Sequence, residues 1–275
     1  MFINNNDKTI TIRQLDPSVD CPVMGTHLKQ SLLLQKAILE ELAAKGKDGY
    51  VIEKSENQVS HYMINHYIMG IFKKKVVSHN DEAIEIEELV AQVTVYIPKV
   101  DEVFDSQIEC FDEFNLNPLE LMMIKGLEVH ESARGNKYAK ILVQIAHSIA
   151  KDHGRRYVIT DIAFANIESL CTFIHSGYIG LKFVHPVGDV ELGIVFIDLE
   201  WRNIVAEAHT ADDYYEVSIN DYHKVKQCAD AGYHPTAMYK SKGSDEWVYH
   251  CQKVPGIENI FAANDPYVNM EEQAA

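Results

Sequence analysis

The sequence has little of what marks secreted, membrane-spanning or metal-binding proteins. Its five cysteines are scattered and include no Cys-x-x-Cys pair, which argues against a disulfide framework and a common zinc pattern. Apolar runs such as residues 67–72 are far shorter than the roughly 18 residues that a spanning helix needs. Residues 1–16 lack the basic and then apolar pattern of a signal peptide. We therefore expect a cytoplasmic protein with reduced thiols, no metal and no membrane segment.

Positive charge is also scarce. The chain has 25 Lys and Arg residues against 41 Asp and Glu residues, a net charge of −16 at pH 7. Nucleic acids and anionic membranes attract clustered cations, so neither is expected as a partner. Residues 134–156 hold six cations and one acid, whereas residues 81–120 hold twelve acids and one cation. The acidic segment is either a solvated face or a region that gathers a cationic amine.

The hydrophobic pattern predicts alternating strands and helices in a chain whose 275 residues suit one large domain or two small ones. The strands are expected at 9–15, within 50–77 around a charged turn, and at 89–98, 121–129, 156–165, 178–184 and 191–199, with a hairpin at 237–241 and 247–254. The helices are expected at 25–44, 139–151, 166–176 and 219–231, and residues 99–118 are expected to be an acidic connection, either loop-like or helical.

The order of elements after residue 120 is strand, helix, strand, helix, strand, strand, which predicts a mixed sheet with helices packed on it. The helix, Gly-Tyr, strand, turn, strand order of 166–199 recurs in 219–254. This recurrence is either a degenerate half-repeat or a chance match of common elements.

Residues 126–142, GLEVHESARGNKYAKIL, join a buried strand, a basic turn and the start of an amphipathic helix. The N-terminus of a helix offers unpaired N–H groups and the positive end of the helix dipole. A basic turn at that position therefore suits a ligand that carries phosphate.

These residues resemble the GNAT superfamily of N-acyltransferases. The family's pyrophosphate loop has the pattern Gln/Arg-x-x-Gly-x-Gly/Ala, and the matching residues here are Arg134, Gly135, Asn136, Lys137, Tyr138 and Ala139, with Lys137 where the family prefers glycine. A second match to the family's later helix end consists of Asn166, Ser169, Phe173, Gly177 and Tyr178. The resemblance covers residues 120–199.

The resemblance implies that the chain binds acetyl-coenzyme A as an acyl donor. Backbone groups of Leu127 and Val129 would pair with the pantetheine arm, and N–H groups from Gly135 to Lys140 would hold the pyrophosphate. The cofactor-binding residues so implied are Leu127, Val129, Arg134, Gly135, Asn136, Lys137, Tyr138, Ala139, Lys140, Asn166, Ser169 and Phe173.

Acyl transfer to an amine requires a base, because an ammonium has no lone pair. Glu128 is the candidate base, with Glu131 and His130 as alternatives, and the Val129 N–H is the candidate donor to the thioester oxygen. Phe173 stands where the family has the tyrosine that acts as an acid. The candidate acid is Tyr178, whose position also matches the family's packing phenylalanine; Cys171 and His175 are further candidates.

The expected fold is α/β (α+β), a GNAT-like mixed, mostly antiparallel twisted sheet flanked by helices, with an appended C-terminal helix and hairpin. Residues 1–200 would form the acyl-coenzyme A-binding domain with an acidic insertion around 80–120, and residues 201–275 a C-terminal extension. The predicted function is N-acetyl transfer from acetyl-coenzyme A to a small cationic amine or a peptide amine, by direct transfer in a ternary complex. The alternative is a catalytically silent acyl-coenzyme A-binding or regulatory module.

Overall fold

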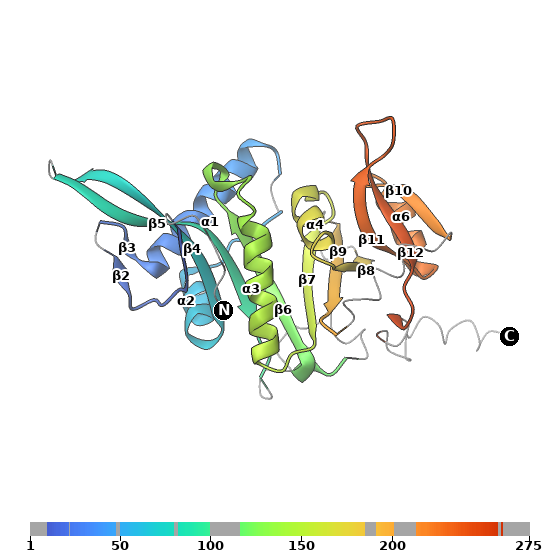
Figure 1. Ribbon diagram of the computed structural model, residues 1–275, viewed down its shortest axis with the longest axis horizontal. Helices are drawn as coiled ribbons and strands as arrows, with labels where there is room; N and C mark the ends of the chain where they lie inside the picture. Colours follow the sequence, from blue (N-terminus) through green and yellow to red (C-terminus); the bar gives the residue numbers. More distant parts are fainter. Residues whose placement is uncertain are drawn as a thin grey trace. The chain divides into compact units, whose positions relative to one another are not determined.

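The computed structural model describes residues 10–21, 23–47, 50–79, 82–99, 116–184, 191–200, 213–257 and 260 (Figure 1). The chain divides into two compact units. Unit 1 comprises Met1–Tyr96 and Ile124–Ser148, and unit 2 comprises Ile97–Met123 and Ile149–Ala275. The domain boundary predicted near residue 200 falls beside residues 201–212, outside the described residues, and stays a prediction.

Unit 1 is built on a sheet with the strand order β1-β4-β5-β6. Its strands are β1 (Ile10–Gln14), β4 (Tyr67–His79), β5 (Glu82–Tyr96) and the second part of β6 (Leu121–Val129), with a small hairpin of β2 (Asp20–Cys21) and β3 (Gly25–Thr26). β1 pairs antiparallel with β4, and β4 pairs antiparallel with β5. The strand predicted at 121–129 is confirmed with the same bounds.

Two helices pack against β4 and β5. The first, α1 (His27–Ala44), begins at the N-cap Thr26 and agrees with the predicted helix. The second, α2 (Glu56–Asn65), replaces the strand that we expected before β4, so that prediction was wrong. A capping box explains the helix: the Ser55 side chain accepts from the Gln58 N–H, and the Gln58 side chain accepts from the Ser55 N–H.

The glutamates at 82, 85, 87 and 88 belong to β5 rather than to a separate acidic segment. The long β4–β5 hairpin places them opposite lysines of β4, where Lys74 pairs with Glu85 at 2.7 Å and Lys75 with Glu88 at 2.5 Å. Cross-strand ion pairs of this kind neutralise part of the acidic charge. Residues 100–115, with most of the other acids, lie outside the described residues.

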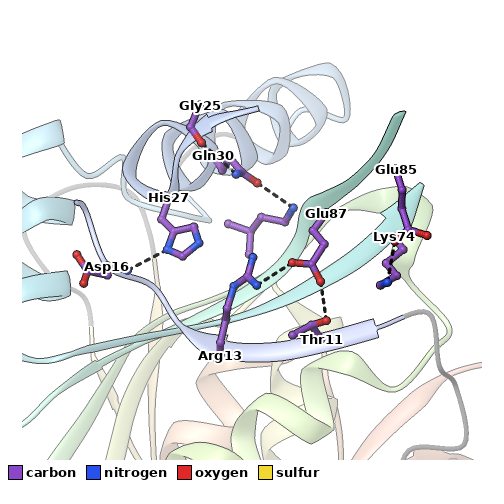
Figure 2. A network of polar contacts seen from close by, with 10 residues as sticks. Thr11, Arg13, Asp16, Gly25, His27, Gln30, Lys74, Glu85 and Glu87 are labelled. Atoms are coloured by element: carbon purple, nitrogen blue, oxygen red, sulfur yellow. Dashed lines mark hydrogen bonds and ion pairs between the residues drawn. The ribbon is translucent and has the colours of Figure 1, made fainter. Parts of the chain in front are cut away.

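A polar cluster connects β1, α1 and the β4–β5 hairpin (Figure 2). Glu87 accepts hydrogen bonds from Thr11 and Arg13, both at 2.7 Å, and the Arg13 guanidinium lies 4.0 Å from the Phe72 ring centroid. His27 accepts at Nδ1 from the Asp16 N–H at 3.1 Å. Burial, and then the nearby Arg13 charge, lower the pKa of His27 below 6.5, so the neutral imidazole is the form that fits this site.

In unit 2 the first part of β6 is followed in the sheet by three further strands, in the order β6-β7-β9-β8. Leu121–Met123 pairs in parallel with β7 (Tyr157–Ala163). β9 (Leu192–Asp198) pairs antiparallel with β7 and with β8 (Ile179–Val184). Parallel and antiparallel pairs together, with antiparallel ones in the majority, confirm the predicted mixed sheet flanked by helices.

The second sheet of unit 2 has the strand order β10-β12-β11. Its strands are β10 (Tyr214–Ser218), β11 (Tyr233–Lys240) and β12 (Trp247–Lys253), and α6 (Tyr222–Asp230) precedes β11. The predicted C-terminal helix and hairpin are confirmed. β10 was not predicted, because its five residues are mostly exposed and show no apolar alternation.

Candidate functional site

The polar end of β6 lies in unit 1, where Glu128 is 2% exposed. Gln92 on β5 donates its side-chain amide to one Glu128 carboxylate oxygen and accepts a 2.8 Å hydrogen bond from Ser31 on α1. Lys54 Nζ lies 3.5 Å from the other carboxylate oxygen. The amide and the ammonium each contact one carboxylate oxygen, which fixes the orientation of the buried carboxyl group.

Lys54 is itself positioned by α1 and by a glycine of β6. Its backbone N–H and C=O form hydrogen bonds of 3.1 and 2.8 Å with the Gln35 side chain. A Cβ on Gly126 would lie 2.9 Å from Lys54 Nζ, so glycine leaves the space that the ammonium fills. Unit 1 therefore brings a buried carboxylate and an amine together over the end of β6.

The backbone of β6 presents alternate residues to its two edges. The His130 N–H donates to the Val90 carbonyl at 2.9 Å, so His130 and Glu128 direct their backbone groups toward β5. Leu127 and Val129, one residue out of phase, direct theirs toward the opposite edge. This orientation is the one expected of two residues that bind an extended ligand through the backbone.

The loop after β6 contains the short helix η3 (Glu131–Ala133) and two residues with left-handed backbone. Gly135 has φ +80° and Lys137 has φ +61°. Asn136 donates to the carbonyls of Ala133 and Arg134 at 3.0 and 3.3 Å, which fixes the loop. A left-handed residue at 137 gives a physical reason for glycine to be favoured there, because the lysine Cβ is strained in that region.

We expect Lys137→Gly to be more stable than Lys137→Ala by about 1 kcal/mol, because both lack the charge and only alanine keeps the backbone strain. Urea unfolding of the two variants measures the difference. Lys140→Gly and Lys140→Ala are the control pair. Lys140 lies inside the helix, where glycine costs about 1 kcal/mol relative to alanine, so here the alanine variant should be the more stable one. The same order at both positions would contradict a left-handed Lys137.

Arg134 does not present a free charge. Its guanidinium binds both carboxylate oxygens of Glu41 on α1 at 2.6 Å each, and its Nε donates to the Val129 carbonyl at 3.3 Å. The hydrogen bonds from Arg134, and then from Lys45, lower the pKa of Glu41 below 4.5. Glu41 therefore holds the arginine of the loop in place at the end of β6.

The helix α3 (Tyr138–Asp152) begins directly after this loop, with Tyr138 buried and with no acid in its first turn. Lys137 and Lys140 are exposed near this end. The other cations of the basic segment lie at or beyond the far end: Arg155 donates to the Pro98 carbonyl, and Arg156 binds Asp198. The basic charge predicted for the turn is thus divided between the two ends of α3.

The predicted site residues of unit 2 lie on and after α4 (Ile167–Ile174). Asn166 is its N-cap and accepts from the Ser169 N–H at 3.3 Å. Phe173 is 1% and Tyr178 0% exposed, and their rings pack edge to face at 5.0 Å. Burial raises the pKa of Tyr178 well above 10, which favours the packing role over the acid role.

The alternative catalytic residues have other contacts. His130 caps η3 by accepting from the Ser132 N–H, and exposed Glu131 lies 3.8 Å from Lys45. In unit 2, His175 Nε2 lies 2.9 Å from the Met238 carbonyl, and burial raises the pKa of Cys171. Of the three candidate bases, Glu128 is thus the buried one.

Sequence reasoning missed the residues that support Glu128 and Arg134, namely Ser31, Gln35, Glu41, Lys54 and Gln92. A signal existed on α1, whose buried face carries His27, Gln30, Ser31 and Gln35 beside Leu34 and Ile38. Polar side chains on the buried face of a helix indicate a buried polar network.

Among the described residues, no group of His, Cys, Asp and Glu side chains gathers as a metal site would. No helix in the described ranges is long and apolar enough to cross a membrane.

Comparison of the sequence with protein-family models and with curated proteins finds no match. Comparison with solved structures finds acetyltransferases. A probable acetyltransferase from Staphylococcus epidermidis matches 69% of this chain and 98% of its own, at 16% identity and a TM-score of 0.47. The NatC complex bound to Gag peptide and CoA matches 70% of this chain and 99% of its own, at 13% identity and a TM-score of 0.47. Arabidopsis thaliana NAA60 in complex with acetyl-CoA matches 70% of this chain and 99% of its own, at 16% identity and a TM-score of 0.47. These likenesses concern the fold alone.

Proposed function

We propose that the chain is an N-acyltransferase that moves an acetyl group from acetyl-coenzyme A to a primary amine by direct transfer. The observation that carries the proposal is the arrangement in unit 1: a buried carboxylate lies on the strand that leads into a basic loop and a helix N-terminus. The family resemblance of residues 120–199 supports the same reading.

The residues present fit an extended ligand with a diphosphate at one end. Leu127 and Val129 direct backbone groups away from β5, and the first turn of α3 offers N–H groups and contains no acid. Exposed Lys137 and Lys140 add positive charge at the same place, and Arg134, held by Glu41, keeps the loop in position. When bound, acetyl-coenzyme A supplies the activated acyl group.

Glu128 accepts the proton of the attacking amine in this proposal, and Gln92 and Lys54 orient its carboxylate. The Val129 N–H donates to the thioester oxygen as charge develops there. The departing thiolate needs little help from an acid, since a thiol of this type has a pKa of about 8.5. A buried Tyr178 is therefore compatible with turnover.

The acceptor is proposed to be a small cationic amine or a peptide amine. The acids among residues 81–120 support this choice, because an acidic segment attracts a cationic amine. The second candidate, a silent acyl-coenzyme A-binding module, is favoured by Phe173 at the position where the family has its tyrosine.

Thermal unfolding with coenzyme A tests the binding part of the proposal. At 100 times Kd, a ligand adds about 2.7 kcal/mol to stability, so a rise of several degrees in Tm is expected. Arg134→Glu should lose most of the rise. Lys36→Glu is the matched control, because Lys36 is 70% exposed on α1 and is not a proposed site residue.

If the Arg134→Glu variant does not fold, Arg134→Gln replaces it in the same measurement. No rise in Tm for the unchanged protein would contradict coenzyme binding. Release of free thiol from acetyl-coenzyme A in the presence of spermidine, or of a peptide with a free N-terminus, tests transfer. Binding without thiol release would favour the silent module.

A further inference from the structure

Unit 2 contains two segments with the same order of elements. The first is β7, α4, β8, β9, and the second is β10, α6, β11, β12. The last strand of each lies between the other two, in the orders β7-β9-β8 and β10-β12-β11, and the pairs within each set are antiparallel.

The correspondence extends to the pairing of single residues. Adding 55 to residues of β7 and β8, and 56 to those of β9, turns the pairs of the first set into pairs of the second, except for Tyr157↔Asp198 and Val158↔Ile197 at the start of β7. Ile159↔Phe196 becomes Tyr214↔Gln252, and Ile179↔Phe196 becomes His234↔Gln252. The irregularity between Gly180 and Lys182 recurs between Pro235 and Ala237. A β-bulge at the same place is a specific feature that common elements do not share by default.

The two helices begin and end alike. The N-caps Asn166 and Asp221, separated by 55 residues, each accept from a backbone N–H three residues on. Gly177 and Gly232, with the same separation, follow the helices with φ of +95° and +81°. A tyrosine follows each glycine.

The buried positions also correspond, although the residue types differ. Four pairs separated by 55 residues are buried in both segments: Ile162 and Val217, Phe164 and Ile219, Leu170 and Val225, and Phe183 and Met238. Shared topology, register, bulge, caps and buried positions together distinguish a repeat from the chance match that the sequence alone left open.

The two segments pack on each other reciprocally. β8 contacts β11, α4 contacts β11, and α6 contacts β8. A Cβ on Gly180 would lie 3.0 Å from the Pro235 ring, and these two positions are equivalent in the repeat. Contact between equivalent positions, with exchanged helix contacts around it, is the pattern of a two-fold axis.

Specific bonds hold this packing. His234 Nδ1 lies 3.0 Å from the Gly180 carbonyl, and His175 Nε2 lies 2.9 Å from the Met238 carbonyl. Tyr222 of α6 packs edge to face with Phe164 at 5.1 Å. His234 and Tyr222 are 2% and 4% exposed, so the contact excludes water.

We infer that residues 213–253 are a second copy of the β7–β9 segment, and that this copy occupies the surface at which two such segments pair as symmetric partners. The interaction surface formed by β8 and α4 is filled from within the chain. The chain consequently works as a monomer. The second copy has no strand, loop and helix like β6 and α3 within it, so it serves as a partner surface rather than a second ligand site.

The double variant Gly180→Cys and Pro235→Cys tests this inference in the full chain. A Cβ added at Gly180 would lie 3.2 Å from the Pro235 Cβ, close to the roughly 3.5–4.5 Å that a disulfide spans. We expect a disulfide within one chain after mild oxidation, located by peptide mass mapping, and a mass of 31.2 kDa by light scattering for the unchanged protein. Asp161→Cys with Pro235→Cys is the control, since β7 is separated from β8 by β9.

A 180–235 disulfide between two chains would overturn the inference, because the copies would then pair between molecules. Failure of the 180–235 pair to link, or linkage of the control pair to the same extent, would show that the copies do not pack about these positions. A light-scattering mass equal to two chains for the unchanged protein would overturn the inference that the chain is a monomer.

Discussion

Replacing Glu128 with glutamine is expected to lower the rate of acetyl transfer by about 10²–10⁴-fold, with the affinity for coenzyme A unchanged. Glutamine has nearly the same shape and can still accept from the Gln92 amide, but it cannot take a proton from an amine. The loss should appear in kcat rather than in coenzyme binding, because the proposed phosphate contacts come from the loop and α3. Steady-state kinetics and calorimetric titration with coenzyme A measure the two quantities.

Lys54→Gln is the matched control. It removes the ion pair at the same carboxylate but leaves the proposed base, so it should retain far more activity than Glu128→Gln. Both variants leave one partly or fully buried group without its charged partner, and each should lose about 1–3 kcal/mol of stability. Equal activity losses in the two variants would indicate that the pair has a structural role. Unchanged activity in Glu128→Gln would exclude Glu128 as the base.

Gly70→Val is expected to lower the free energy of unfolding by about 3 kcal/mol. A Cβ at Gly70 would meet the methyl groups of Leu15 and Leu89 well inside van der Waals contact, with the Phe72 ring at 3.1 Å. These three side chains are at most 5% exposed and have little room to move. Urea unfolding measures the loss, provided that the m-value, the slope of the unfolding free energy against urea concentration, is the same for both proteins.

Ser78→Val provides the comparison on the same strand. Ser78 is exposed on β4, where valine is a good strand former and meets no buried neighbour. Its effect on unfolding should lie within about 0.5 kcal/mol. A small effect at Gly70 as well would mean that Leu15 and Leu89 do not close over this part of the strand.

The sequence predicts an element well where the pattern that forms it is local. The apolar run of β6 and the pair Asn166 and Gly177 around α4 were each visible within about a dozen residues. The helix α2 was missed because only its capping box, Ser55 with Gln58, distinguishes it from an extended segment. The candidate site follows the same rule: the loop and Glu128 were found from local motifs.

Long-range partners are the part of the site that the sequence could not indicate. Glu41 is 93 residues from Arg134, and Gln92 is 36 residues from Glu128. Each is a common residue type in an ordinary helix or strand, and only the fold brings it to its partner. The repeat in unit 2 was visible as element order, but its main evidence is strand register, which requires coordinates.

The covalent connection between the two copies in unit 2 affects how their contact responds to dilution. Two separate molecules that pair through the surface around Gly180 would come apart below their dissociation constant. A tethered partner instead has an effective concentration in the millimolar range, which does not fall as the protein is diluted. The contact between β8 and β11 therefore persists at the nanomolar concentrations of an enzyme assay, and the buried environment of His234 does not depend on how much protein is present.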